Sequence, residues 1–485
     1  MVSGSSQMSL LPEQTSVDHA FFTVPYVVVS GANQSRALSF VPSPAYQAFF
    51  GPVAGYLKVM RTRILFPSRL VNLLLLSLMV CFVSLNSLEV FADSPNKEIN
   101  QNLLRARDLG IIIGRYQPGP WNAITDVAGV KVGHVTLIKG HGPLVPGKGP
   151  VRTGVTVIIP RDDVWHKKVP AGAFVLNGTG EVTGLAWVAE AGFLEYPIAL
   201  TNTLNVPRVA NGVMSWMFKH NPEIGITDDT LTPVVAECDD SRLNDSRGRH
   251  VSEDDVVRAL DEAISGPVAE GTVGAGTGMI SYQFKGGIGT SSRRLSEKDG
   301  GFTIGVLVNA NHGRRHELTI SGVPVGRLWQ GKKPGSKSAG LLSLGNGAQL
   351  SKREQLGDQG SIIIVIATDA PVDARQLQRM ARRAVLGLAR TGATSHHGSG
   401  DFILAFSTGN EIPHYPNDPT FFLKHLADTH LNPILAATVE ATEEAIINAL
   451  VAATTVVGRD GRRVQAIEHE QLKRLLQVQL KSDPF

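Results

Sequence analysis

The sequence contains only two cysteines among its 485 residues, Cys81 and Cys238. Cys81 lies in a segment that we expect to be removed, which leaves Cys238 as the single cysteine of the exported chain. No intramolecular disulfide is then available, and the chain is too long for a minimal disulfide-stapled scaffold. The fold must rest on a hydrophobic core, and the length is sufficient for a large one.

An excess of one charge is also lacking. Lys and Arg number 46, Asp and Glu number 43, and the net charge is +3. A protein that follows a phosphate backbone needs a clustered positive excess, so the composition argues against nucleic acid as a partner. With 42% hydrophobic and 18% charged residues, the chain is also unlike a disordered polar protein.

Glycine, by contrast, is plentiful. The chain has 50 glycines, above the roughly 7% of an average protein, and they follow no collagen-like period. We therefore expect many tight turns and close backbone approaches. Such loops suit an enzyme without proving one.

The longest largely apolar stretch spans residues 70–85, which is shorter than the roughly 20 residues of a transmembrane helix. Three arginines between residues 61 and 69 precede it, and Val90-Phe91-Ala92 follow it. A basic region, an apolar region and small residues at a cleavage site form the pattern of a secretory signal peptide. We expect residues 60–92 to be such a signal, cleaved after Ala92, and not an uncleaved membrane anchor.

Residues 1–59 show neither helical nor strand periodicity. We expect translation to start at Met60, which would make residues 1–59 an artefact of the start codon or a disordered extension. The signal predicts a periplasmic or secreted bacterial protein, with no stable membrane anchor once the signal is removed.

Beyond about residue 106, short β-branched runs alternate with glycine turns. The apolar runs over residues 305–310 and 361–367 have the length of strands that are buried on both faces. Apolar residues at three- and four-residue spacing predict helices over residues 181–192, 253–265, 373–389 and 435–451. The mixture predicts a layered α/β or α+β domain, with a polar surface loop over residues 329–360.

Two glycine-rich segments resemble nucleotide-binding motifs, and both depart from them. In residues 331–338 (GKKPGSKS), Lys337-Ser338 is in register with a phosphate-binding loop, but Ser336 stands at the second glycine. In residues 271–278 (GTVGAGTG), Met279 falls where the third glycine of a dinucleotide motif belongs. For this second segment we expect a closely packed glycine turn.

Histidines are the candidates for a metal site, namely His312, His316 and the adjacent pair His396-His397. Adjacent side chains point apart on an extended chain, and no carboxylate or cysteine completes a known ligand spacing. We therefore expect structural or surface roles for them, and neither a metal nor an organic cofactor.

One dipeptide has different chemistry, because Gly360 ends the loop and Ser361 begins the apolar run SIIIVIA. If the bond between them is cut, Ser361 gains an α-amine whose pKa of about 7.7 to 8.0 leaves a fraction unprotonated near neutral pH. That amine can act as the base for its own hydroxyl, as in N-terminal nucleophiles. The dipeptide alone favours an ordinary strand-capping serine, and the wider sequence changes that balance.

Several blocks of the sequence are specific in combination. They are NAITDVAGVKVGH (122–134), LNGTGEVTGL (176–185), EGTVGAGTGM (270–279), FKGGIGTSSR (284–293), VLVNANHG (306–313), GSIIIVIATDAP (360–371) and TSHHGSGDF (394–402). Together they resemble the DmpA/BapA family, the L-aminopeptidase/D-esterases and β-peptidyl aminopeptidases. The resemblance extends from about Leu103 to Gly461.

The resemblance implies an α+β fold, a four-layer αββα sandwich similar to N-terminal nucleophile hydrolases but differently connected. It also implies a precursor that cleaves itself before its nucleophilic serine, here between Gly360 and Ser361. An α chain of residues 93–360 and a β chain of residues 361–485 then stay associated as parts of one peptidase domain. Such αβ units assemble into homo-oligomers.

The same resemblance assigns roles to individual residues. Ser361 matches the nucleophile, and Ser399 with Asp401 matches the pair that holds and polarises its amine. Asn311 in VLVNANHG matches the amide that stabilises the oxyanion, and its neighbour Asn309 is a weaker candidate. Glu237 matches the carboxylate that anchors the free amino group of a substrate, which implies an aminopeptidase.

Asp239 departs from the family pattern. Relatives often carry an aromatic hydroxyl two positions after the glutamate, where this chain has Asp239. The change puts the rate or substrate range in doubt, and the added carboxylate could instead bind a more cationic substrate. Without the resemblance, Asn309, Asn311 and Ser399 would be taken for residues that satisfy turn backbone.

The leading hypothesis is an exported, self-processing serine aminopeptidase that acts on short peptides, amides or esters through an acyl-enzyme on Ser361. An acyltransferase of the same architecture is a second hypothesis, although the ornithine acetyltransferases use threonine as nucleophile. A periplasmic binding protein or an inactive enzyme that keeps the fold is a third, and a binding protein has no reason to cleave at Gly360.

Overall fold

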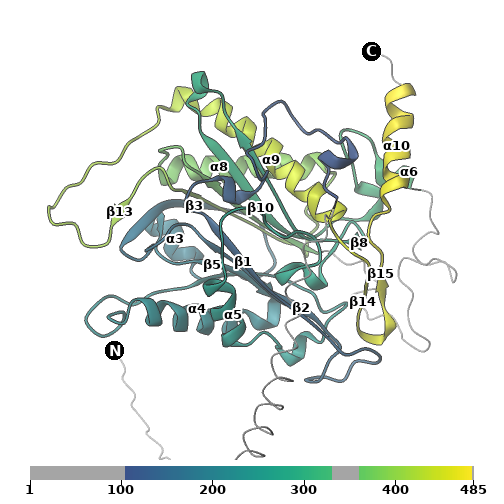
Figure 1. The fold of residues 1–485 in the computed structure, drawn as a ribbon, viewed down its shortest axis with the longest axis horizontal. Helices are drawn as coiled ribbons and strands as arrows, with labels where there is room; N and C mark the ends of the chain where they lie inside the picture. The colour runs from purple at the N-terminus through teal and green to yellow at the C-terminus, as the bar shows by residue number, and fades with distance from the viewer. Residues whose placement is uncertain (1–103, 330–359, 483–485) are drawn as a thin grey trace, which may run out of the picture. The chain divides into compact units, whose positions relative to one another are not determined.

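The computed structural model describes residues 104–329 and 360–482 (Figure 1). The predicted signal peptide, the GKKPGSKS segment and nearly all of the predicted loop over residues 329–360 lie outside the described residues.

The larger of the two main sheets has seven strands, with the order β13-β3-β12-β11-β10-β9 and with β4 paired to β3 beside this path. β11 (Ser361–Thr368) runs parallel to β12 (Gly400–Ser407) and antiparallel to β10 (Thr303–Asn311). β11 is therefore an interior strand with both edges hydrogen-bonded. The other strands are β3 (Lys167–Gly178), β4 (Phe193–Leu194), β9 (Gly287–Arg294) and β13 (Ile412–Pro413).

The smaller main sheet has the order β1-β2-β5-β6. Its strands are β1 (Lys131–Lys139), β2 (Val151–Ile159), β5 (Ile198–Asn202) and β6 (Val234–Cys238). β5 and β6 are parallel, and the other two pairings are antiparallel. Two short ribbons complete the strands of the described residues, β7 (Ile280–Ser281) with β8 (Phe284–Lys285) and β14 (Val456–Val457) with β15 (Arg463–Val464).

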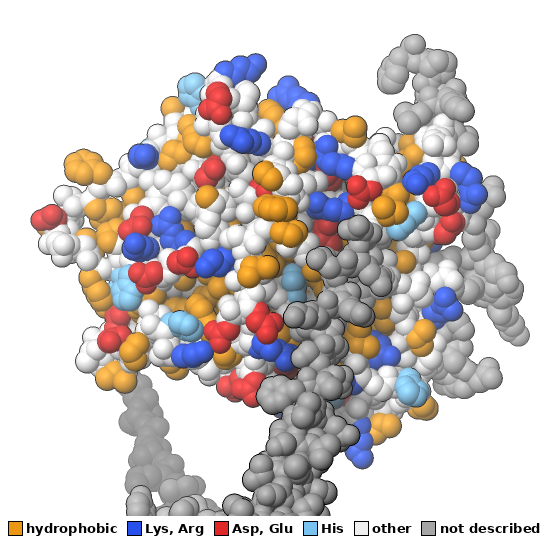
Figure 2. Space-filling model, viewed as in Figure 1, with side chains coloured by type: hydrophobic (Ala, Val, Ile, Leu, Met, Phe, Trp, Pro, Cys, Tyr) orange, Lys and Arg blue, Asp and Glu red, His pale blue; other side chains and the backbone are white. Residues whose placement is uncertain are grey.

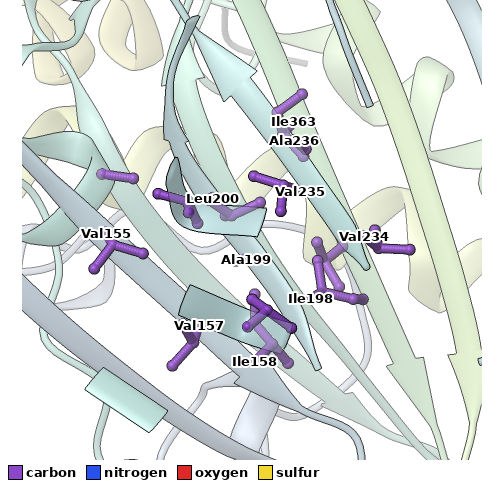
Figure 3. Packing of buried hydrophobic residues seen from close by; sticks show 14 of the residues in the cluster. Val155, Val157, Ile158, Ile198, Ala199, Leu200, Val234, Val235, Ala236 and Ile363 are labelled. Atoms are coloured by element: carbon purple, nitrogen blue, oxygen red, sulfur yellow. The ribbon is translucent and has the colours of Figure 1, made fainter. Parts of the chain in front are cut away.

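The two faces of β11 show how the layers stack. Its odd-numbered side chains from Ile363 to Ala367 join the core cluster that contains the smaller sheet, and Figure 3 shows Ile363 beside Ala236 of β6. Its even-numbered side chains from Ile362 to Ile366 join a second cluster under helices. Successive side chains of a strand point to opposite faces, so β11 is buried on both sides, as its apolar run predicts.

Helices cover the two outer faces (Figure 1). α8 (Ala374–Arg390) and α9 (Leu431–Val451) pack on the larger sheet, while α4 (Val206–His220) and α5 (Glu253–Asp261) pack on the smaller one. The other α-helices of the described residues are α3 (Leu185–Ala191), α6 (Val325–Leu328) and α10 (His469–Ser482). The order helices, sheet, sheet, helices confirms the expected αββα sandwich of an α+β fold.

The sequence of α8 explains its boundaries and its buried face. The side chain of Asp373 accepts a hydrogen bond from the Gln376 backbone N–H at 2.7 Å, which caps the first turn. Buried side chains follow at three- and four-residue spacing from Leu377 to Leu388. In α9, by contrast, nearly every side chain from Leu431 to Val451 is buried, so this helix lies inside the domain.

One predicted helix begins in the wrong place. Residues 181–192 were expected to be helical throughout, but α3 begins only at Leu185, after Gly184 with φ +68°. The backbone N–H of Glu181 instead donates a hydrogen bond to the Glu237 side chain at 3.1 Å. The predicted helix over 253–265 ends earlier, at Asp261, and the one over 435–451 begins earlier, at Leu431.

The glycine-rich segment 271–278 forms a tight turn, as expected. Residues Gly274–Gly278 make a buried 3-10 helix. A Cβ at Gly276 would lie 2.4 Å from the Ile288 backbone nitrogen, so a larger residue would force the chains apart.

The visible surface carries both charges. Figure 2 shows Lys and Arg side chains interspersed with Asp and Glu over the face it presents, without a continuous basic stripe. Across residues 104–329 and 360–482, no helix combines the length and the apolar character that crossing a bilayer requires.

A buried ionic cluster joins α9 to β9 and to the segment that precedes β1. Arg293 is fully buried, and its Nη2 lies 2.7 Å from Glu444 Oε2. Arg107 Nε lies 2.8 Å from Glu444 Oε1, and Arg293 Nε lies 3.3 Å from Glu440 Oε2. Burial alone would raise the pKa of Glu444, but Arg293 and the hydrogen bonds from Arg107 and Asn122 outweigh it and lower that pKa.

We expect Glu444→Ala to lower the free energy of unfolding by about 3 to 5 kcal/mol, because it leaves the Arg293 charge buried without its nearest partner. Urea denaturation measures the change. Glu297→Ala is the control, since its exposed pair with Arg294, at 4.0 Å, should contribute less than about 1 kcal/mol. Equal losses in the two variants would contradict the prediction.

Candidate active site

Ser361 lies at the first position of β11, where three strand ends meet. In the sheet register it stands opposite Gly400 of β12 and Asn311 of β10. The backbone N–H of Gly400 donates a hydrogen bond to Ser361 Oγ at 3.1 Å. The side chain shares a face with Ile363, toward the smaller sheet, and the residue is buried. A hydroxyl group is thus held at the edge of the core between the sheets.

Ser399 and Asp401 flank Gly400 at the start of β12. Ser399 Oγ donates a hydrogen bond to Asp401 Oδ2 at 2.8 Å, and both residues are buried. Burial raises the pKa of the Asp401 carboxyl above its ordinary value, while the hydrogen bond from Ser399 opposes this rise. Asn177 of β3 supports the pair, since its Nδ2 lies 3.2 Å from Ser399 Oγ and 2.7 Å from the His396 carbonyl.

The side-chain amide of Asn311 is fixed on both sides. Its Nδ2 donates to the Asp239 carbonyl at 3.1 Å, and its Oδ1 accepts from the Ile280 backbone N–H at 2.8 Å. The amide plane beside Ser361 is therefore set by two segments distant in sequence.

Asn309 lies two residues earlier on the same face of β10 and has the opposite character. It is fully buried, and among residues 104–329 and 360–482 neither its Oδ1 nor its Nδ2 has a hydrogen-bond partner. An unsatisfied buried amide costs about 1 to 3 kcal/mol, which natural folds rarely tolerate without a function. Asn309, the weaker of the two candidates from the sequence, is thus the one whose side-chain amide has no hydrogen-bond partner among the described residues.

Glu237 of β6 faces the same region from the smaller sheet. Its Oε1 accepts the hydrogen bond from Glu181 N–H, and its Oε2 accepts one from the Thr203 hydroxyl. Burial raises the pKa of Glu237, although these hydrogen bonds oppose the rise. A Cβ built on Gly180 would lie 2.8 Å from Glu237 Oε1 and 3.7 Å from the Gly400 Cα. The carboxylate and the strand end beside Ser361 therefore border one small space.

Asp239 reaches the site through its backbone, whose carbonyl receives the Asn311 hydrogen bond. Its half-buried carboxylate accepts from the Ser241 backbone N–H at 2.8 Å and so shapes its own turn. The next residue, Asp240, is fully buried, and its Oδ1 accepts from Ser246 Oγ at 2.7 Å and Asn244 Nδ2 at 3.0 Å. Burial raises the pKa of Asp240 to about 7, against the effect of its hydrogen bonds.

The four histidines do not form a metal site together. Burial lowers the pKa of His312 to about 3, so this imidazole is neutral, and its ring packs edge-on against Tyr282. His396 Nε2 lies 2.8 Å from Glu317 Oε1. Within residues 104–329 and 360–482, the one group of three ligating side chains that could share an ion contains none of these histidines.

Three supporting residues were not singled out from the sequence. Asn177 lies in the block LNGTGEVTGL but carries neither a charge nor a nucleophile. Thr203 and Gly400 act through a hydroxyl and a backbone N–H, and both groups occur throughout the chain. The position of Gly400 between Ser399 and Asp401 is the only signal that could have found it.

The sequence profile of peptidase family S58 matches residues 122–464. This chain belongs to peptidase family S58. The family assignment confirms the resemblance noted in the sequence, and it covers the segments that hold Glu237, Asn311, Ser361 and Asp401.

Several known proteins are similar to this chain over most of its length. A protein named beta-peptidyl aminopeptidase BapA from Sphingosinicella xenopeptidilytica is 48% identical over 376 residues, which are 77% of this chain and 91% of the relative. The structure of an L-aminopeptidase D-Ala-esterase/amidase from Ochrobactrum anthropi superposes with a TM-score of 0.68 at 42% identity, covering 77% of this chain and 98% of that one. A beta-aminopeptidase from Burkholderia sp. gives the same TM-score and identity, with 77% and 99% coverage.

These findings establish the enzyme class. The Ochrobactrum structure is described as a prototype for the serine aminopeptidases and a new variant of the Ntn hydrolase fold. This S58 peptidase is accordingly a serine aminopeptidase of the N-terminal nucleophile type, which confirms the leading hypothesis at that level. The roles of the individual site residues remain predictions.

We expect Asp240→Asn to flatten the dependence of stability on pH. Folding raises the pKa of this carboxyl from its ordinary value of about 3.9 to about 7, so the folded state binds the extra proton between these pH values. The resulting stabilisation is full below about pH 4 and disappears as the pH rises to about 7. Relative to the variant, the parent should lose up to about 4 kcal/mol of unfolding free energy over this interval.

Urea denaturation at pH 4, 5.5, 7 and 8 measures this slope. Asp162→Asn is the matched control, because the Asp162 side chain is 79% exposed. If Asp162→Asn changes the slope of unfolding free energy against pH as much as Asp240→Asn does, the assignment of this slope to Asp240 is wrong.

Proposed function

We propose that this S58 peptidase cleaves its own chain between Gly360 and Ser361 and then uses Ser361 to remove the N-terminal residue of short peptides, amides or esters. The observation that carries the proposal is the seating of this dipeptide. Gly360 lies against the end of β10, and Ser361 opens an interior strand beside Asn311 and Gly400.

Sterics at Gly360 support cleavage at this bond. The residue has φ +49°, and a Cβ there would lie 2.0 Å from the Asn311 carbonyl oxygen and 2.8 Å from His312 Cα. Any residue but glycine would be strained and would clash with backbone that cannot move without disturbing β10. The carbonyl of Gly360 is thus presented to Ser361 without a side chain in the way.

The chemistry of the first step is an acyl shift followed by hydrolysis. Ser361 Oγ adds to the Gly360 carbonyl carbon, the C–N bond breaks as the nitrogen takes up a proton, and an ester joins Gly360 to Ser361 Oγ. Water then cleaves this ester and leaves the Gly360 carboxylate and a free α-amine on Ser361. The Ser361 hydroxyl is restored, and the new α-amine of the same residue can act as its base.

In the second reaction the α-amine accepts the proton of Ser361 Oγ as the oxygen attacks the substrate carbonyl. The buried Ser399–Asp401 pair orients that amine. The amide of Asn311, opposite Ser361, and the unsatisfied amide of Asn309 supply donors for the oxyanion, which gains most from fixed donors in a buried site. The amine or alcohol leaves, and water releases the acyl group from Ser361.

Glu237 sets the substrate class. A buried carboxylate that borders the strand end beside Ser361 suits the ammonium group of a substrate's N-terminus. Two relatives, 48% and 43% identical, are named beta-peptidyl aminopeptidases. We include N-terminal β-amino acid residues among the substrates on that support.

Export and assembly belong to the same proposal. The pattern of residues 60–92 supports secretion with cleavage after Ala92, which leaves an α chain of 93–360 and a β chain of 361–485. The β10–β11 pairing and the ion pairs of Arg293 with Glu440 and Glu444 would hold the two chains together. The proposal also includes assembly of these αβ units into a homo-oligomer.

We expect Ser361→Ala to remain one uncut chain, while the parent yields two chains whose masses sum to that of the precursor plus one water. Intact-mass spectrometry measures this, and N-terminal sequencing should find Ser361 at the start of the smaller chain. Ser296→Ala, which removes the exposed hydroxyl bonded to Asp299, should be processed like the parent. A parent that stays uncut would overturn the proposal.

We expect Glu237→Gln to lower kcat/KM for substrates with a free amino group by about 10- to 150-fold, mainly through KM, since a hydrogen-bonded ion pair is worth about 1.5 to 3 kcal/mol. The parent should also lose activity as the pH falls through the raised pKa of Glu237, because protonation removes the negative charge.

Steady-state kinetics with an aminoacyl p-nitroanilide provide the measurement. Glu190→Gln on the exposed face of α3 is the control and should behave like the parent. A Glu237→Gln enzyme with unchanged KM would show that another group holds the amine.

A further inference from the structure

A second cluster of polar side chains lies at the opposite end of β12 from Ser361. It consists of Asp228 and Asp229, in the loop between α4 and β6, and His414, which follows β13 directly. One ligating atom from each residue lies within 4.8 Å of the others. The proposed reaction uses none of these groups.

The imidazole of His414 has one committed nitrogen and one uncommitted nitrogen. Nδ1 lies 3.0 Å from the Trp165 carbonyl oxygen. A carbonyl only accepts hydrogen bonds, so Nδ1 carries the hydrogen and the neutral ring keeps its lone pair on Nε2. The side chain is 3% exposed, and Nε2 has no hydrogen-bond partner among the described residues. A buried lone pair without a hydrogen-bond donor is rare in folded proteins, and a bound ion would satisfy it.

Two carboxylates face this lone pair. His414 Nε2 lies 3.6 Å from Asp228 Oδ1 and 3.8 Å from Asp229 Oδ2. These separations are too long for hydrogen bonds. Two ligand atoms at about 2.0 to 2.2 Å from one tetrahedral ion lie about 3.4 Å apart. The distance from His414 Nε2 to each carboxylate is within a few tenths of an ångström of this spacing, and all three ligand atoms lie within 4.8 Å of one another.

The surroundings hold these groups in place. The His414 ring lies between the rings of Trp165 and Tyr415, each at a centroid distance of 4.5 Å. Trp165 Nε1 donates to Asp228 Oδ2 at 2.8 Å, and the Tyr415 hydroxyl donates to Asp228 Oδ1. The carbonyl behind the imidazole and the Trp165 donor on Asp228 Oδ2, the oxygen that is not assigned to the ion, are supporting contacts of the kind that metal ligands use. Asp228 Oδ1, which faces His414, also accepts a hydrogen bond from the Asp229 backbone N–H at 2.7 Å. Asp229, at 77% exposure, leaves the site open to solvent.

We propose that Asp228, Asp229 and His414 bind one divalent transition-metal ion, with Zn²⁺ as the best match to one imidazole nitrogen and two carboxylate oxygens. Water completes the coordination on the exposed side. Because β12 separates the cluster from Ser361, the ion acts on structure. It clamps the loop before β6 to the segment after β13 and takes no part in peptide hydrolysis.

Calorimetric titration of the purified, chelator-treated full-length protein with ZnCl₂ tests the proposal. One Zn²⁺ per chain should bind, and saturation should raise the unfolding temperature. Asp229→Asn and His414→Ala should each lose this binding and this shift. Asp229 is exposed, so its variant keeps the fold even if His414→Ala disturbs the packing of the two aromatic rings. Peptidase activity should not change when the ion is removed.

His425→Ala is the matched control, because this half-exposed imidazole faces a single carboxylate, Asp373 Oδ2 at 3.4 Å, without a second one. It should bind Zn²⁺ like the parent. The proposal is overturned if the parent shows no saturable Zn²⁺ binding, which would leave an imidazolium–carboxylate ion pair. It is equally overturned if binding survives in both cluster variants, or if Ca²⁺ binds in preference to Zn²⁺.

Discussion

The contact between Gly360 and the backbone of Asn311 is the constraint on which the site depends. Because no side chain fits between them, only glycine is accommodated directly before Ser361, the first residue of β11. Pairing with β10 and β12 then places Asn311 and Gly400 on either side of the hydroxyl. Three segments far apart in sequence contribute, so the site exists only when the central strands of this sheet have assembled.

Burial gives these groups their chemistry. The site lies where both sheets and their covering helices exclude water, and Ser361, Ser399, Asp401, Asn309 and Glu237 are all buried. Removing carboxylates from water raises their pKa values, and fixed donors act more strongly at low dielectric. Most of the polar atoms are satisfied within the fold, while the amide of Asn309 is not. The fold thus retains an unsatisfied buried amide on β10, the strand paired with the one that Ser361 begins, and this amide lowers stability there.

The sequence predicted the elements well where the hydrophobic pattern was strong, as in the interior strand over 361–367 and the helix over 373–389. It predicted the start of α3 wrongly, because the periodicity continues through residues 181–184 while their backbone turns toward Glu237. It also left the partners of the site residues unidentified. Asn177 and Thr203 contribute through their side-chain contacts with Ser399 and Glu237, and a local sequence pattern does not predict such long-range contacts.

The sequence by itself determined a layered α/β or α+β domain, the family and the dipeptide at the head of the interior strand, because hydrophobic period, glycine placement and motif blocks are local properties. Only the tertiary structure decided which polar groups share a space. Glu237 arrives from the smaller sheet, Asp401 from the neighbouring strand, and His414 meets Asp228 across almost two hundred residues. Such meetings depend on strand register and on how layers pack, and both are fixed by contacts between residues distant in the chain.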